Sequence, residues 1–225
     1  MEYLIFIIPA LLISVYAQFN IKSTYKKYSQ IRSSRGTTGA NAAAALLQRN
    51  GLGGKVAINQ IPGDLTDNYD PRNNTLNLSE TVHGNTSIAA IGVAAHEVGH
   101  AIQHSERYAP LELRASIVPV ANFASSASFP ILLVGFLLNS MNLVLVGILL
   151  FSAVVVFHLV TLPVEFNASQ RAVAQLSQAG LVSHDEVPMV KKVLGAAAMT
   201  YLAATLTAVA NLLYYVMIFA GGRDD

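Results

Sequence analysis

Four long apolar stretches constrain this chain of 225 residues more than any other feature of its sequence. A helix needs about 20 predominantly apolar residues to cross the core of a bilayer, and each stretch approaches that length. They cover Tyr3–Phe19, Ile117–Leu138, Leu143–Leu162 and Val193–Ala220. Charged residues make up only 12% of the chain, against about a quarter in ordinary globular chains. We therefore predict a mainly α, polytopic helical membrane protein with about four spans.

The four stretches differ in character. No Lys or Arg precedes the first and no small-residue cleavage site follows it, so we interpret it as a retained anchor rather than a signal peptide. The second is interrupted by Pro119 and Pro130 and is the weakest. Only residues Asn139–Asn142 separate it from the third and strongest, which predicts a tight helical hairpin. The fourth is rich in Ala and Thr, which favours close helix packing.

The basic residues predict the orientation. Thirteen of the fourteen Lys and Arg residues lie in two segments, Lys22–Arg114 and Arg171–Lys192, and only Arg223 lies elsewhere. Four spans place both segments on one face, and the positive-inside rule makes that face cytoplasmic. We expect a multi-pass protein of the cell membrane with both termini outside. The net charge of +1 does not indicate a nucleic-acid partner, and the absence of Cys excludes thiolate metal sites.

The segment between the first two spans has the pattern of a small α+β domain. Thr37 or Thr38 can begin a helix that runs to about Asn50, and Thr86 or Ser87 can begin a long one over Ile88–Ser105. Alternating patterns predict strands at Lys55–Ile61 and Thr75–Ser79, with turns at Pro62–Gly63 and Asp70–Asn74. The predicted organisation is an anchor (1–20), a cytoplasmic α+β domain (21–115), a transmembrane hairpin (116–163), a cytoplasmic helix (164–192) and a fourth span with its tail (193–225).

The long helix carries a candidate metal site in His96-Glu97-Val98-Gly99-His100. Residues four apart share one face of a helix, so both imidazoles can reach one Zn²⁺. Glu97 is then placed to take a proton from a water activated by the metal. Two surface histidines on a helix are the alternative, but the apolar run Ile88–Ala95 before the motif predicts a buried helix.

A catalytic zinc site needs a third protein ligand and an open position, and four residues are candidates. His104 lies eight residues after His96, about 12 Å along a helix, which is too far for one ion. Glu106 would require a glycine where Gln103 stands. His158 lies in the third span and is favoured as a supporting or pore-facing residue. Glu165 follows that span on the cytoplasmic side, and the small residues Ala168 and Ser169 permit close helix approach, so we favour Glu165.

These motifs together resemble the bacterial family of membrane-bound neutral zinc metallopeptidases. A more distant similarity is to the heat-shock membrane proteases and the CAAX prenyl proteases. The matching pieces are Lys22–Tyr28, Leu65–Pro71, Ala94–Ala101, Pro119–Asn122 and Leu162–Ser169, which are spread over nearly the whole chain. In the distant relatives the third ligand belongs to a Glu-x-x-Ala-Asp motif. The resemblance therefore implies Glu165 as ligand, but Ser169 stands where those relatives have Asp.

The leading hypothesis is an integral-membrane zinc endopeptidase whose small cytoplasmic α+β domain is zincin-like. In it, His96, His100 and Glu165 are the metal ligands and Glu97 is the general base. Its substrates would be peptides or membrane proteins. The alternatives are a non-catalytic membrane scaffold with structural zinc, which requires a fourth protein ligand, and a zinc amidohydrolase of non-peptide substrates. The sequence predicts no oligomeric state.

Three further features leave alternatives open. The segment Thr75–Ser79 is either an edge strand that holds peptide substrate or a structural strand. Arg171, His184 and Tyr108 are candidates for oxyanion stabilisation, with Arg171 favoured over the other two, although the interpretation of Arg171 as a plain membrane-surface arginine is preferred to this role. Asp67 and Asp70 are expected to form turns rather than to bind calcium.

Overall fold

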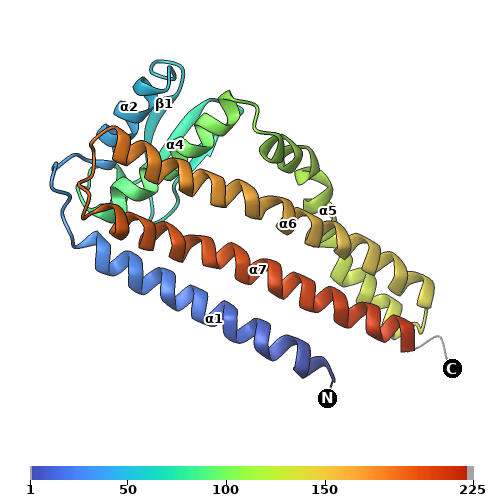
Figure 1. The fold of residues 1–225 in the computed structure, drawn as a ribbon. Helices are drawn as coiled ribbons and strands as arrows, with labels where there is room; N and C mark the ends of the chain where they lie inside the picture. Colours follow the sequence, from blue (N-terminus) through green and yellow to red (C-terminus); the bar gives the residue numbers. More distant parts are fainter. Residues whose placement is uncertain (1, 222–225) are drawn as a thin grey trace. The chain divides into compact units, whose positions relative to one another are not determined.

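The computed structural model describes the backbone of residues 2–221 and the side chains from residue 7 onward. Helices dominate, as predicted (Figure 1). In chain order the elements are α1 (Glu2–Ser29), α2 (Gly39–Arg49), β1 (Ala57–Ile61), β2 (Asn68–Asp70), β3 (Thr75–Ser79), α3 (Glu80–His83), α4 (Ile88–Ser105), α5 (Ala109–Leu137), α6 (Met141–Gln178) and α7 (Val187–Gly221). The described chain divides into two compact units. We name them the apolar unit (2–18, 109–163 and 200–221) and the site unit (19–108 and 164–199).

Among the described residues, three helices are long and apolar enough to cross a membrane, namely α5, α6 and α7. The first predicted span, Tyr3–Phe19, falls within α1 but begins among residues whose side chains lie outside the description, so a fourth span stays a prediction. The last part of the predicted tail, residues 222–225, is also outside it.

The predicted hairpin between the second and third spans is present in the apolar unit. Helix α5 ends at Leu137 and α6 begins at Met141. A Cβ atom at Gly135 would lie 2.8 Å from the backbone nitrogen of Val144, so the two helices pack too closely there for any side chain. Helix α5 also continues through both of its prolines instead of breaking at them.

The predicted cytoplasmic helix 164–192 is not a single helix. Helix α6 runs through Pro163 to Gln178, and α7 already begins at Val187, before the predicted start at residue 193. Gly180 ends α6 because its φ of 63° is a left-handed conformation that glycine adopts without strain, and the N–H of Leu181 donates to the Leu176 carbonyl. The basic residues Lys191 and Lys192, assigned from sequence to the end of the cytoplasmic helix, lie on the first turns of α7.

The site unit contains a three-stranded sheet in the order β1-β3-β2. Strand β3 is parallel to β1 and antiparallel to β2. Both predicted strands are confirmed, whereas β2 was missed because its three residues adjoin the turn chemistry of Asp70–Asn74. Of the two alternatives left open for Thr75–Ser79, the structure excludes the edge strand: β3 has a neighbour on each side, and the edges are β1 and β2.

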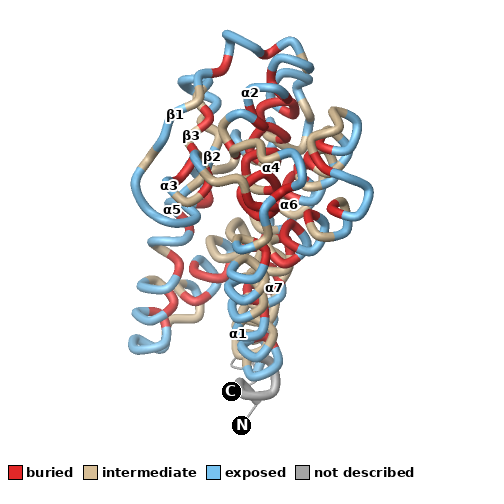
Figure 2. The backbone as a smooth tube through the Cα atoms, turned by 90° about the vertical axis from the view of Figure 1, so that its left-hand side faces the viewer, coloured by how far each residue is buried: buried red, intermediate tan, exposed pale blue. Residues whose placement is uncertain are grey.

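Helix α4 has the predicted bounds and lies in the core of the site unit. The Ser87 hydroxyl accepts a hydrogen bond from the Ala90 N–H at 3.2 Å and begins the helix. Apart from the partly buried Val93, the residues of its apolar run Ile88–Ala95 are buried with apolar side chains of α2, among them Leu46 and Leu47. Figure 2 shows burial concentrated along α4 and α2. The result is a rigid, water-excluded support for the residues that follow.

Candidate active site

Helix α4 presents His96 and His100 on one face, as their spacing predicts. Their ring centroids are 4.8 Å apart, and the rings are nearly perpendicular, at 84°. The side chains of His96 and His100 are only 14% and 12% exposed to solvent, respectively. Both imidazoles therefore lie in a largely desolvated setting, with an edge of each ring still open.

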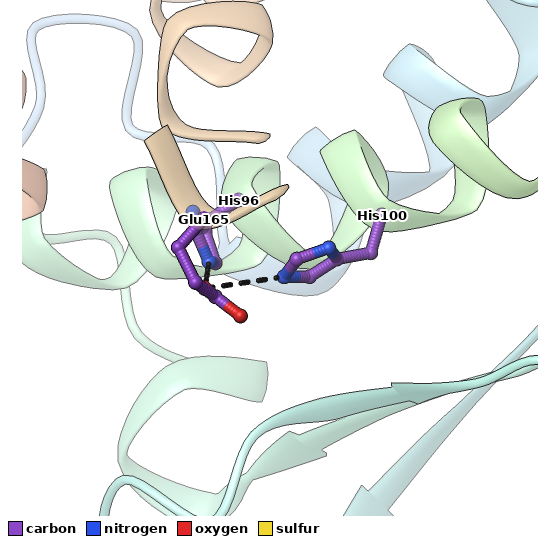
Figure 3. Close-up of side chains that lie close together, drawn as sticks. All are labelled: His96, His100 and Glu165. Atoms are coloured by element: carbon purple, nitrogen blue, oxygen red, sulfur yellow. Dashed lines mark hydrogen bonds and ion pairs between the residues drawn. The ribbon is translucent and has the colours of Figure 1, made fainter. Parts of the chain in front are cut away.

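Helix α6 brings Glu165 to the two histidines because α4 and α6 approach unusually closely at Gly99. A Cβ atom at that position would lie 2.7 Å from the Ala168 carbonyl oxygen, so any other residue would push the helices apart. As Figure 3 shows, the Glu165 side chain points toward both rings. Its Oε2 lies 3.2 Å from His96 Nε2 and 3.6 Å from His100 Nε2.

The ligand atoms of these three residues all lie within 4.8 Å of one another. Two imidazole nitrogens and one carboxylate oxygen form the donor set of many catalytic zinc sites. The Glu165 side chain is only 3% exposed, and a buried carboxylate needs a compensating positive charge. The residues present therefore fit a divalent metal ion.

The surrounding charges also favour a cation. Burial lowers the pKa of His100, but the Glu165 carboxylate and the charge of Glu97 outweigh that effect and raise the pKa above its usual range. Glu97 itself is 8% exposed and lies next to His96 on α4. Glu97 is thus largely buried, and its carboxylate lies within electrostatic reach of His100.

The other predicted candidates lie elsewhere. His104 Nδ1 is 2.8 Å from the Tyr69 hydroxyl, which itself donates to Asn74. Glu106 forms an ion pair with Arg171 at 2.7 Å. His158 belongs to the apolar unit and is outside the group of three donors. Among the described residues, the group thus contains His96, His100 and Glu165 and no fourth His, Asp or Glu.

Of the three candidates for oxyanion stabilisation, Arg171 and Tyr108 lie against each other. The Arg171 guanidinium is held by Glu106 and by the Asn167 side chain, at 2.6 Å, and lies over the Tyr108 ring at 5.9 Å. His184 is an exposed residue of the turn before α7. No role in catalysis follows for any of them from these contacts.

Sequence reasoning missed two polar contacts behind the histidines. The Ser169 hydroxyl lies 3.2 Å from His96 Nδ1. The Gln103 carbonyl oxygen lies 2.9 Å from His100 Nδ1, and the Gln103 side chain is completely buried. A glutamine within the apolar stripe of α4, one turn after a candidate ligand, was the signal that could have identified the second contact.

Comparison with known proteins gives the family. The family model described as "Putative neutral zinc metallopeptidase" matches residues 3–220. The chain is 49% identical over 225 residues to the "Putative membrane protease YugP" of Bacillus subtilis (strain 168), and the match covers the full length of both chains. No solved structure matches. The protein therefore belongs to the family that this model describes, and the resemblance noted in the sequence is confirmed.

Proposed function

We propose that the protein is an integral-membrane zinc endopeptidase in which His96, His100 and Glu165 hold the metal and Glu97 is the general base. The observation that carries this proposal is the convergence of those three donors within 4.8 Å, with the buried Glu97 following His96 on α4 and within electrostatic reach of His100. Family membership supports zinc and peptide hydrolysis as the chemistry of the site. The domain limits and the cytoplasmic position of the site belong to the same proposal and rest on the distribution of Lys and Arg.

The residues divide the work as follows. Zinc, when bound, would supply a Lewis acid that polarises the scissile carbonyl and lowers the pKa of water. Glu97 takes the proton of the attacking water and later delivers it to the leaving amine. The buried surroundings of Glu97 keep bulk water from competing for that proton. His96, His100 and Glu165 are held in place by the close contact at Gly99 and do not exchange protons with substrate.

The number of donors favours catalysis over a structural metal. Structural zinc is almost always held by four protein ligands, whereas catalytic zinc has three and an open position. His104, which would have to complete a structural site from α4, is instead paired with Tyr69. The group formed within the described part of the chain has three members. This supports an enzyme rather than a scaffold.

Purified protein in detergent provides the test. We expect about one zinc per chain, as a single catalytic site requires. We also expect cleavage of an unfolded fluorogenic protein substrate that stops with a chelator and returns with zinc. Stoichiometric zinc with no cleavage of a broad peptide library would contradict the proposal and favour the scaffold. Hydrolysis of small amides but not of peptides would favour a non-peptide amidohydrolase.

A further inference from the structure

Gln103 is a completely buried polar side chain at the contact between α4 and α6. A buried amide that lacks partners destabilises the fold by about 1–3 kcal/mol per group, so its hydrogen bonds carry information. Its oxygen faces His100 Nδ1 at 2.9 Å. Its nitrogen faces the Val164 carbonyl at 2.9 Å and the Asn167 side-chain oxygen at 3.0 Å.

The orientation of the Gln103 amide follows from its partners. The backbone carbonyl of Val164 can only accept, so the group that faces it must be the NH₂ of Gln103. Asn167 gives the same answer independently. Its side-chain oxygen already accepts from the Arg171 guanidinium, which can only donate, so this oxygen also requires a donor from Gln103.

This orientation fixes the tautomer of His100. With its NH₂ committed to α6, Gln103 offers only its carbonyl oxygen to His100 Nδ1. The Nδ1 atom must then carry the proton, and the lone pair of the neutral ring lies on Nε2. That Nε2 is the atom that faces Glu165 Oε2 at 3.6 Å. The His100 ring is thus prepared as a metal ligand before any ion arrives.

The Gln103 side chain also contacts the segment of α6 that contains Glu165, the third candidate ligand. Val164, whose carbonyl accepts from Gln103, immediately precedes Glu165 on α6. The chain of bonds continues from Asn167 to Arg171 and ends at the Arg171–Glu106 ion pair. One residue of α4 therefore holds a ring of its own helix and the backbone of the opposite one.

We propose that Gln103 is a positioning residue for the metal site: its oxygen fixes the ring and tautomer of His100, and its nitrogen fixes the α6 segment that carries Glu165. This inference rests on the proposed function, since it assigns Gln103 a role toward the metal. Partners of this kind behind a ligating histidine change metal affinity by about 10- to 100-fold when they are removed.

Three variants separate the proposal from a merely structural role. Gln103→Met keeps the approximate size of the side chain and removes both its acceptor for His100 and its donor to α6. Gln103→Glu keeps an acceptor for His100 Nδ1 but gives up the donor to α6. Gln175→Met is the matched control, because Gln175 is also a glutamine of a helix contact, accepting from Asn50 at 3.0 Å, in a different place on α6. The readouts are the zinc dissociation constant, from competition with a chromophoric chelator, the Co²⁺ visible spectrum and the thermal stability of the metal-free protein.

We expect zinc binding about 10- to 100-fold weaker in Gln103→Met, together with an altered Co²⁺ spectrum. Gln103→Glu, which keeps the acceptor for His100 but loses the donor to α6, should bind zinc more weakly than wild type but more tightly than Gln103→Met, even though its metal-free form melts earlier than wild type. Gln175→Met should bind as wild type. A merely structural role predicts that affinity follows stability, so Gln103→Glu would then bind no better than Gln103→Met. That result, or unchanged affinity in Gln103→Met, would overturn the inference.

Two outcomes are kept distinct. Wild-type protein that holds no zinc would contradict the proposed function, whereas zinc held equally by wild type and Gln103→Met would contradict the role of Gln103 alone. If Gln103→Met did not fold, histidine-selective ¹⁵N NMR of the zinc-loaded wild type gives the tautomer directly. A protonated Nδ1 on His100 is expected, and a protonated Nε2 would overturn the inference.

Discussion

The Ser169 hydroxyl lies 3.2 Å from Nδ1 of His96, while Nε2 of the same ring faces Glu165 Oε2 at 3.2 Å. The two rings of the site are therefore supported differently. A hydroxyl can donate or accept, so Ser169 does not impose a tautomer on His96. Gln103 does impose one on His100. Ser169 stands where the more distant relatives suggested by the sequence have a carboxylate, which would impose a tautomer and raise the basicity of the ring.

The first prediction concerns that serine. Ser169→Ala removes the partner of His96 and should weaken zinc binding by about 10-fold. Ser169→Asp supplies an acceptor for an Nδ1 proton and should bind zinc more tightly than Ser169→Ala. Chelator competition measures both, with the exposed α6 residue Ser177→Ala as control. Equal affinity in Ser169→Ala and wild type would show that the contact does not support the ligand.

The second prediction concerns the third donor. Glu165→Gln keeps the shape of the side chain but removes the charge beside the two histidines, and it should lose most of the bound zinc. His158→Ala should keep its zinc, because His158 is outside the group of three donors. The measurement is the zinc content of the two purified variants. Full zinc in Glu165→Gln together with loss in His158→Ala would move the ligand to His158.

Much of this arrangement was predictable from local pattern. The bounds of α4 followed from a Ser87 cap and a continuous apolar run, and the pairing of His96 with His100 followed from helical spacing. Glu165 was predicted as the partner from its place after the third span and from small neighbours. The small residue Ala168 does permit a close helix approach, because its backbone packs against Gly99 of α4. Gly99 itself was not identified from the sequence.

The features that could not be predicted from the sequence are those that depend on contacts between distant segments. Strand β2 has three residues and is defined by its pairing with β3, so no periodicity indicates it. The central place of β3 in the sheet depends on the same pairing. Gln103 has no local signature other than polarity on an apolar face, and its role emerges only when Val164 and Asn167 of α6 are brought beside it.

The third prediction concerns hydrogen bonds of Glu186 within the site unit, whose contribution to stability should depend on pH. Glu186 accepts hydrogen bonds from the Ser183 N–H at 2.7 Å and from the N–H and hydroxyl of Ser34, the latter at 2.9 Å. Burial alone would raise the pKa of the Glu186 carboxyl, but these hydrogen bonds outweigh burial and lower the pKa. A lowered pKa means that the stabilisation is complete above the pKa of the unfolded chain and is lost as pH falls through the folded value.

Glu186→Gln should therefore reduce stability by about 1–3 kcal/mol at pH 7, and the difference from wild type should shrink below about pH 4.5. Thermal melting of both proteins in detergent across this range is the measurement. The exposed neighbour Asp185→Asn serves as control. A difference that stayed constant with pH would show that the charge of Glu186 is not what stabilises this turn.

The fourth prediction concerns orientation. The chain contains no cysteine, so single cysteines can report on each side of the membrane. A cysteine at Ser140, between α5 and α6, should react with an impermeant thiol reagent in intact cells, and one at the exposed Asp64 of the site unit should not. Both should react after permeabilisation. The reverse pattern in intact cells would place the candidate active site outside.

The most direct test of the account separates catalysis from metal binding at Glu97. Glu97→Gln keeps the size and hydrogen-bonding capacity of the side chain and removes only the base. The variant should hold as much zinc as wild type and melt at nearly the same temperature. Its cleavage of an unfolded or membrane-protein substrate should fall by at least about 100-fold, the lower end of general-base catalysis. Cleavage by Glu97→Gln at the wild-type rate, with zinc bound, would contradict the mechanism.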